Sequence, residues 1–204
     1  RRRAAGDGRA LMVGGRGVQL DAASAVRDAE LFVCVELMGS GADARVRQAS
    51  AVERAWLDPA KLQEQVELVF DAERDVVQAL RRERYDGLLL SEASVPADDV
   101  AQVAEVLAQA ASTAPLRVLP EDPELHGLLA RLTCLADWLP DLGLPVTAEE
   151  ALAAVLPQLC MGQRSFAALR RADWKGALLG QLDHRQRAAL ERDAPERLAV
   201  PSGS

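Results

Sequence analysis

The residues of this sequence best suited to chemistry are arginines that can contact phosphate, together with a tyrosine. Three arginines and the single tyrosine of the chain lie within the run RRERY, which ends at Tyr85. A guanidinium forms paired hydrogen bonds with phosphate oxygens, and an aromatic ring stacks on a nucleobase. Other arginines occur earlier, in a glycine-rich turn and in a segment with strand periodicity. The sequence therefore predicts a contact to single-stranded nucleic acid through Arg16, Arg45, Arg47, Arg81, Arg82, Arg84 and Tyr85.

An alternative role for the same arginines is to form ion pairs on a solvated surface, and charge alone favours this alternative. Alternation along a strand places Arg82 and Arg84 on the face opposite Arg81 and Tyr85. The four side chains therefore meet one ligand only if a bulge intervenes. The carboxylates expected in neighbouring strands belong to Glu36, Glu67, Glu73 and Glu83.

The overall charge limits the kinds of ligand that the chain can bind. Its 204 residues carry a formal charge of -7, which argues against a free-standing nucleic-acid-binding protein. The negative charge is unevenly distributed, since residues 1–95 have a net charge of -2 and residues 96–204 a net charge of -5. Any anion-binding face is therefore expected in the first half of the chain.

Motifs for other kinds of chemistry are absent from the sequence. Neither Lys61 nor Lys175 lies in a Gly-Lys-Ser/Thr loop, and no GxSxG, HExxH, GxGxxG or DEAH pattern occurs. His126 and His184 are expected to be solvated or capping residues. Three cysteines without metal-binding spacing are expected to be buried thiols in a reducing compartment. We therefore expect no catalytic residue, metal site or cofactor site here, and a cytoplasmic protein without a membrane span.

The elements that must position the arginines have strand periodicity up to about residue 95. A short helix is predicted at Asp58–Gln65, where Asp58 and a proline give the start signal. A turn is predicted at Asp71–Asp75, and Gly87 is interpreted as a bend in the last strand. With a helix between the third and fourth strands, this order predicts an OB-fold-like, five-stranded barrel over residues 1–95. The strands are Arg9–Leu20 with a glycine interruption, Ala29–Met38, Ala44–Ala51 and two strands between Val66 and Glu92.

From Pro96 the hydrophobic period changes to that of helices, which predicts a helical domain over residues 96–204. Trp138 and Trp174 flank predicted helix ends and are expected in the core. The fold class is therefore α+β. The predicted helix N-caps are Asp122, Thr147 in a capping box with Glu150, Ser165, Asp173 and Asp183.

Four stretches, in order and spacing, resemble the C-terminal region of HrpB-type bacterial DExH-box ATP-dependent RNA helicases. They are GRALMVGGRGVQL, DAELFVCVELMGSGADARVRQASAV, YDGLLLSE and ERDAPERLAVPSGS. The VPSGS ending and DAELFVCVEL are the most specific of these, and the resemblance spans nearly the whole chain.

The resemblance implies an OB-fold followed by a helical, family-specific domain, taken from a longer enzyme. It also implies that two RecA-like motor domains, which bind ATP and Mg²⁺, lie upstream and contact this region. In related DExH helicases the OB domain helps to line the RNA channel, so the implied function is an accessory part of the single-stranded RNA path, with weak RNA binding of its own. Two alternatives remain: a protein-interaction module that binds no nucleic acid, and a small enzyme that uses one of the histidines.

Overall fold

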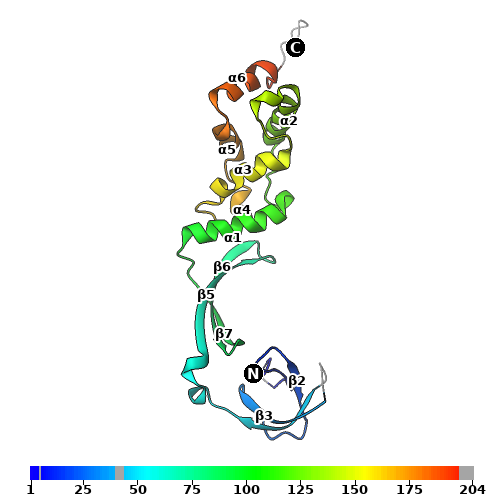
Figure 1. Cartoon of the computed structure of the whole chain (residues 1–204), viewed down its shortest axis with the longest axis vertical. Helices are drawn as coiled ribbons and strands as arrows, with labels where there is room; N and C mark the ends of the chain where they lie inside the picture. The colour runs from blue at the N-terminus through cyan, green and yellow to red at the C-terminus, as the bar shows by residue number, and fades with distance from the viewer. Residues whose placement is uncertain (5, 40–43, 198–204) are drawn as a thin grey trace. The chain divides into compact units, whose positions relative to one another are not determined.

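The computed structural model describes residues 1–4, 6–39 and 44–197, which form an α+β protein as predicted (Figure 1). The sequence also predicts a turn at Gly39, Ser40, Gly41 and Asp43. All but Gly39 of these, and the terminal VPSGS sequence, lie outside the described residues. The chain divides into two compact units. The first contains Arg1–Glu67 and Ala79–Val95, and the second contains Leu68–Gln78 together with the chain from Pro96 onward.

The first sheet lies in the first unit and has the strand order β1-β2-β4-β3. β1 and β2 are antiparallel, β2 runs parallel to β4, and β3 is antiparallel to β4 with a bulge near Glu36. One face buries Ala10, Val18 and Val46, whereas the other carries exposed side chains, because side chains alternate along a strand. The strands are β1 (Arg9–Leu11), β2 (Gly17–Leu20), β3 (Phe32–Met38) and β4 (Arg45–Ala51).

The second sheet has the strand order β5-β6-β7. β5 (Leu62–Asp71), β6 (Val76–Tyr85) and β7 (Leu88–Val95) follow one another along the chain. The turn between β5 and β6 lies where the sequence predicts it. The Asp71 carboxylate accepts the backbone N–H groups of Glu73 and Arg74, at 3.0 and 3.2 Å.

The described strands do not form the expected five-stranded closed barrel, because two predicted strands each fold back on themselves. Gly14 and Gly15 have φ angles of 83° and 81°, and they turn Arg9–Leu20 into the β1–β2 hairpin. Asp86 and Gly87 have φ angles of 49° and 81°, and they form a tight turn between β6 and β7 instead of a bend within one strand. The result is a four-stranded and a three-stranded sheet, neither of which is closed.

The predicted helix at Asp58–Gln65 is a single 3-10 turn over Pro59–Lys61. Its start is as predicted, since the Asp58 carboxylate accepts the Ala60 N–H at 3.0 Å. Its predicted end is wrong, because β5 already begins after Lys61. A helix this short does not gain enough hydrogen bonds to offset its nucleation, and the apolar β-formers that follow favour a strand.

Five of the helices described in the second unit begin at the predicted caps, whereas the first begins after Asp99, which was not predicted as a cap. Asp122, Thr147, Ser165, Asp173 and Asp183 each accept a backbone N–H in the first helical turn through their side chains. The helices are α1 (Val100–Thr113), α2 (Pro123–Trp138), α3 (Ala148–Cys160), α4 (Phe166–Leu169), α5 (Trp174–Gln181) and α6 (His184–Asp193). Their core is leucine-rich and includes Leu107, Leu125, Leu132, Leu135, Val155 and Leu169.

The tip of the β5–β6 hairpin is part of the helical unit. Val77 donates its backbone N–H to the Arg164 carbonyl at 2.8 Å, and Phe166 donates its own to the Asp75 carbonyl at 3.0 Å. The ring of Phe166 is fully buried, with its centroid 4.6 Å from that of Phe70. The helical unit is therefore completed by residues that precede it in the sequence.

Three expectations about single side chains need correction. Cys160 is buried as predicted, but Cys34 is half-buried and Cys134 is exposed. Trp174 is buried, whereas Trp138 is 62% exposed, because it lies at the last residue of α2.

Among the described residues the longest helix is α2, and none is long and apolar enough to cross a membrane.

Candidate nucleic-acid interface

The arginines of β6 are held by carboxylates of the first unit. Glu67 lies between Arg82 and Arg84, and each of its carboxylate oxygens is 2.5 Å from a guanidinium nitrogen. Arg82 also donates to Glu92 at 2.6 Å. Hydrogen bonds from Arg84 and Arg82 hold the pKa of the Glu67 carboxyl below its ordinary value. These two arginines thus have the ion-paired arrangement that was the alternative to a contact with nucleic acid.

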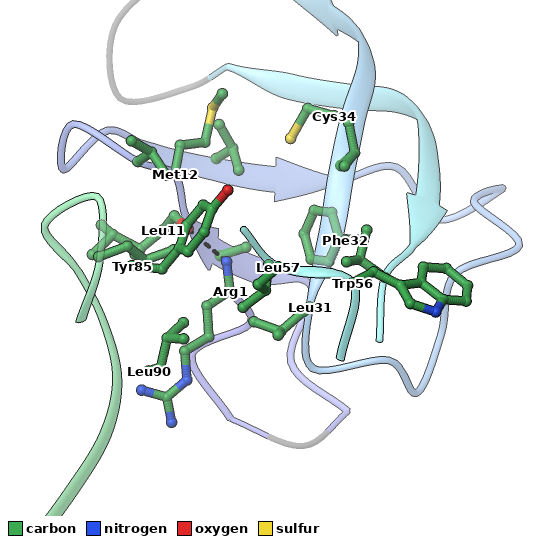
Figure 2. Close-up of a pocket in the computed structure, with 16 residues that line it drawn as sticks. Arg1, Leu11, Met12, Leu31, Phe32, Cys34, Trp56, Leu57, Tyr85 and Leu90 are labelled. Atoms are coloured by element: carbon green, nitrogen blue, oxygen red, sulfur yellow. Dashed lines mark hydrogen bonds between the residues drawn. The ribbon is translucent and has the colours of Figure 1, made fainter. Parts of the chain in front are cut away.

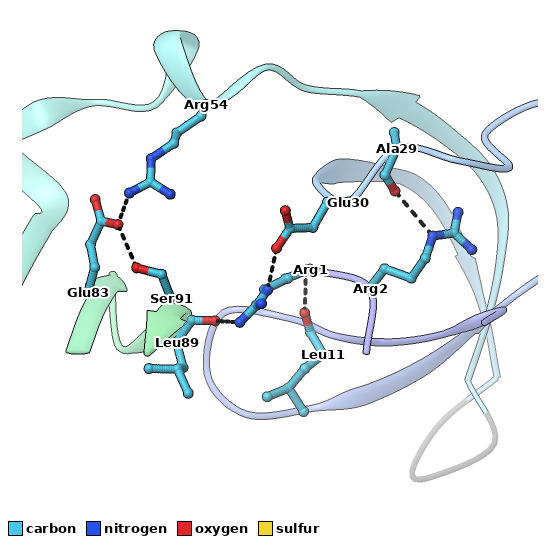
Figure 3. A network of polar contacts seen from close by, with 9 residues as sticks. All are labelled: Arg1, Arg2, Leu11, Ala29, Glu30, Arg54, Glu83, Leu89 and Ser91. Carbon is cyan, nitrogen blue, oxygen red and sulfur yellow. Dashed lines mark hydrogen bonds and ion pairs between the residues drawn. The ribbon is translucent and has the colours of Figure 1, made fainter. Parts of the chain in front are cut away.

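The neighbouring residues of β6 take different partners, and the pairing of β6 with β7 has an irregularity between Glu83 and Arg84. Arg81 is 3.6 Å from Glu64, and Glu83 forms an ion pair with Arg54. Ser91 donates its hydroxyl to Glu83 at 3.1 Å, so Glu83 links two other segments of the same unit (Figure 3). No single ligand-facing cluster of arginines results on β6.

Tyr85 does not accompany the arginines. It lines an apolar cavity of about 440 Å³ in the first unit (Figure 2). The α-amino group of Arg1 lies at the same cavity and donates to the Leu11 carbonyl at 2.7 Å. Burial raises the pKa of the Cys34 thiol there, which disfavours the thiolate form. A cavity lined in this way suits apolar packing better than a nucleic-acid backbone.

Arg45 and Arg47 lie together on the exposed face of the first sheet. Val46, between them, is fully buried, so the two arginines point to the opposite side. Arg47 is 3.7 Å from Glu36, and the Arg16 guanidinium donates to the Gly39 carbonyl at 3.3 Å. The structure therefore separates the predicted set into a sheet group of Arg16, Arg45 and Arg47, and a β6 group.

Two further arginines lie on this exposed face, and neither was predicted from the sequence. Arg9, on β1, pairs in register with Gln19 on β2, and Gln19 pairs with Arg45 on β4. Arg3 lies beside them, because its backbone N–H donates to the Arg9 carbonyl at 3.0 Å. The run RRR at the start of the sequence indicated basic character, but only the pairing with β1 places Arg3 on the sheet.

Arg2, between these residues, is buried and has a structural role. Its guanidinium donates to the backbone carbonyl of Ala29 at 3.1 Å (Figure 3). It also donates to the carbonyls of Asp7 and Val26, at 2.5 and 3.0 Å. It also lies over the ring of Phe32, 5.9 Å from the centroid. These contacts leave Arg2 unable to reach a ligand and fix the segment that carries Arg3.

No group of three metal-binding side chains occurs among residues 1–4, 6–39 and 44–197. The arginines of the exposed face can bind a ligand electrostatically. Guanidinium groups on a sheet surface bind anions without forming or breaking covalent bonds.

Comparison with known proteins shows what the chain is similar to. The chain is 28% identical over 212 aligned residues to the ATP-dependent RNA helicase HrpB of Escherichia coli, with all of the chain matched. The chain is similar over its whole length to the C-terminal part of HrpB. The resemblance inferred from the sequence is thus confirmed. No protein-family model matches the chain.

A solved structure of E. coli HrpB gives the same relationship. The chain matches a crystal structure described as the DExH-box NTPase HrpB with a TM-score of 0.50 and 28% identity over all of its residues. A second crystal structure, described as the DEAH/RHA helicase HrpB, has a TM-score of 0.49 and 26% identity. The chain spans 26% of the length of E. coli HrpB. The remaining part of HrpB has no counterpart in the present sequence.

Proposed function

We propose that the chain is the C-terminal accessory module of an ATP-dependent RNA helicase. The observation that carries this proposal is the similarity of the whole chain to the C-terminal part of E. coli HrpB. The sequence has no Gly-Lys-Ser/Thr loop, so ATP and Mg²⁺ would be bound by RecA-like motor domains elsewhere in the same protein. The module would contact RNA and those motor domains, and the protein would be cytoplasmic.

Within this module, the first unit would contribute to the single-stranded RNA path. Its first sheet has exposed arginines on one face, whereas the charged arginines of β6 are held by Glu67 and Glu92. We therefore assign the RNA contact to Arg16, Arg45 and Arg47, and a stabilising role in the fold to Arg82 and Arg84. The OB-like character of this unit stays a prediction.

The first test is the reading frame upstream of Arg1. A Gly-Lys-Thr or Gly-Lys-Ser loop followed by a DExH box in the same frame is the expected result, because those motifs bind and hydrolyse ATP. A frame that encodes no motor motif would show that the chain does not serve a helicase of this kind.

The second test measures ATP hydrolysis by the complete protein. Changing Arg45 and Arg47 to Gln should lower RNA-stimulated ATPase activity several-fold and leave basal activity unchanged, because the substitutions remove charges from the RNA path only. The control variant changes Arg171 and Arg185, two exposed arginines of the helical unit, to Gln. Equal loss of basal and stimulated activity in the first variant would contradict a role in RNA contact.

A protein-interaction module without nucleic-acid binding is the second candidate. The ion pairs of Arg82 and Arg84 favour it, because they occupy the most basic strand of the chain. For this candidate, the Arg45 and Arg47 substitutions would leave RNA-stimulated activity unchanged, and the chain would bind isolated motor domains in the absence of RNA.

A further inference from the structure

A basic hollow of about 370 Å³ lies on the exposed face of the first sheet, and three arginines line it. They are Arg3, Arg9 and Arg45, with Gln19 between them. We propose that this hollow binds the phosphate groups of single-stranded nucleic acid, with Arg45 at the centre of the contact. The proposal deepens the accessory function proposed above and rests on it for the identity of the ligand.

The strand register brings the three guanidinium groups to one place. Arg9, Gln19 and Arg45 form a single row across β1, β2 and β4. Since neighbouring strands lie about 4.8 Å apart, the backbones of Arg9 and Arg45 are roughly 10 Å apart, within reach of one bound phosphodiester segment. The β-carbon of a residue replacing Gly17 would lie 3.8 Å from the Arg3 guanidinium, so Arg3 extends over β2 beside this row.

The arginines of the hollow have fewer carboxylate partners than Arg82 and Arg84 of β6. Within the described part of the chain, Arg3 and Arg45 form no ion pair, and Arg9 pairs with Asp7 at 3.0 Å. Among the residues that the structure describes, no carboxylate lines the hollow. An arginine without a carboxylate partner can bind a phosphate without first breaking an ion pair, whereas Arg82 and Arg84 would have to leave Glu67.

The surroundings of Arg45 favour an extended chain over a single small anion. Arg45 also lines a second hollow, which includes Arg47, Met38 and Gln48, with Asp21 as its acidic member. Met38 pairs in register with Arg45, and its side chain is 54% exposed. Val35, on the same strand, is 64% exposed. A strand of nucleic acid that places phosphates on the arginines would have apolar surface nearby for unpaired bases.

The test is a fluorescence-anisotropy titration of the whole 204-residue chain against a labelled oligouridylate at several salt concentrations. The test variant carries Arg3→Gln, Arg9→Gln and Arg45→Gln. The control variant carries Arg81→Gln, Arg171→Gln and Arg185→Gln, and therefore has the same net charge. Thermal unfolding of each variant checks that the fold is retained, and Arg45→Gln alone is measured beside them.

The test variant should bind at least tenfold more weakly at low salt, with the control close to the unchanged chain. Each phosphate contact contributes about 0.7 to the slope of log K against log salt for a single strand, so losing three should reduce the slope by about 2. The single Arg45→Gln variant should lie between the two.

Three results would overturn the proposal: no binding by the unchanged chain at the lowest salt, equal losses in test and control variants, or competition by polyglutamate as strong as that by unlabelled oligouridylate. The last would identify the ligand as an acidic polypeptide. Any of them leaves the accessory function to be judged by the upstream reading frame, which does not depend on this hollow.

Discussion

Glu67 shows how one carboxylate decides the role of two arginines. Its pKa is lowered by hydrogen bonds from Arg84 and Arg82, so the ionised form is favoured in the folded chain. A lowered pKa contributes stability that is present above the ordinary value for glutamate and is lost as the pH falls through the lowered value. The ion pairs on β6 should therefore support the fold at neutral pH and not in acid.

We expect Glu67→Gln to lower the Tm at pH 7 and to have a smaller effect at pH 3, because pH 3 lies below the ordinary pKa of glutamate and the stability contributed by the ionised carboxyl is being lost there. Circular dichroism during thermal unfolding at the two pH values measures this difference. Glu105→Gln, at an exposed position of α1, is the matched control and should change the Tm little at either pH. A loss of stability that is equal at pH 7 and pH 3 would contradict the role of the Glu67 charge.

The cysteines give a second prediction for single residues. Burial raises the pKa of Cys160 to about 11, whereas Cys134 is exposed. In the folded chain at pH 8, Cys134 should be alkylated first, Cys34 more slowly and Cys160 only after unfolding, because the thiolate is the reactive form. Mass spectrometry after timed alkylation gives the order. Rapid labelling of Cys160 without urea would show that the α3 core opens more readily than the structure indicates.

Whether a helical residue lies on the apolar, buried face of its helix can be predicted from the sequence. The stripe of α2 contains Leu125, Leu128 and Leu132, which are all buried. Cys134 lies off this stripe, so its exposure follows from the helical period, even though its apolar neighbours suggested burial. Arg3 and Arg9 are different, because their place beside Arg45 depends on the pairing of β1 with β2 and of β2 with β4.

At the scale of elements, the helix starts were predictable because a cap is a local interaction between residues two or three apart. The strand pairing was not, since a glycine within an apolar run is compatible with either a bend or a turn. At Gly87 the preceding Asp86 was the informative residue, because Asp-Gly is a preferred pair for a two-residue hairpin turn.

The Asp86–Gly87 turn leads to a prediction with a matched control. Gly87 has a φ of 81° and open space around its α-carbon, so Gly87→Ala should lower the free energy of unfolding by about 1–2 kcal/mol through backbone strain alone. Gly127, exposed within α2, also has open space but lies in a helix. Gly127→Ala should instead stabilise the chain by up to about 1 kcal/mol. Urea unfolding measures both, and effects of the same sign would argue against this turn.

At the scale of the whole molecule, the helical unit depends on the hairpin tip. A boundary placed at residues 95 and 96 separates Phe70 and Val77 from Phe166 and Arg164, which they contact. A segment of residues 96–197 alone would expose part of a core that the whole chain covers. Residues that are far apart in the sequence therefore belong to the same core.

We expect residues 96–197 to unfold at a lower urea concentration than the whole chain, with a loss of about 3 kcal/mol, the scale of removing a large buried side chain. Fluorescence of Trp174 reports this unfolding when Trp138 is changed to Phe in both proteins and Trp56 is also changed to Phe in the whole chain. Addition of Leu68–Gln78 through a short linker should restore part of the loss. Equal stability of the segment and the whole chain would contradict the dependence on the hairpin tip.

The position of Asp75, at that tip, imposes two requirements that few residue types meet together. Its backbone has a φ of 56°, and its carboxylate is 2.5 Å from the Arg117 guanidinium. Asparagine and glycine accept such a backbone but lack the charge, and glutamate has the charge but accepts the backbone less well. In an alignment of related sequences we therefore expect positions 75 and 117 to covary. Aspartate should accompany arginine or lysine, and substitution of position 117 by an uncharged residue should be accompanied by asparagine or glycine at position 75.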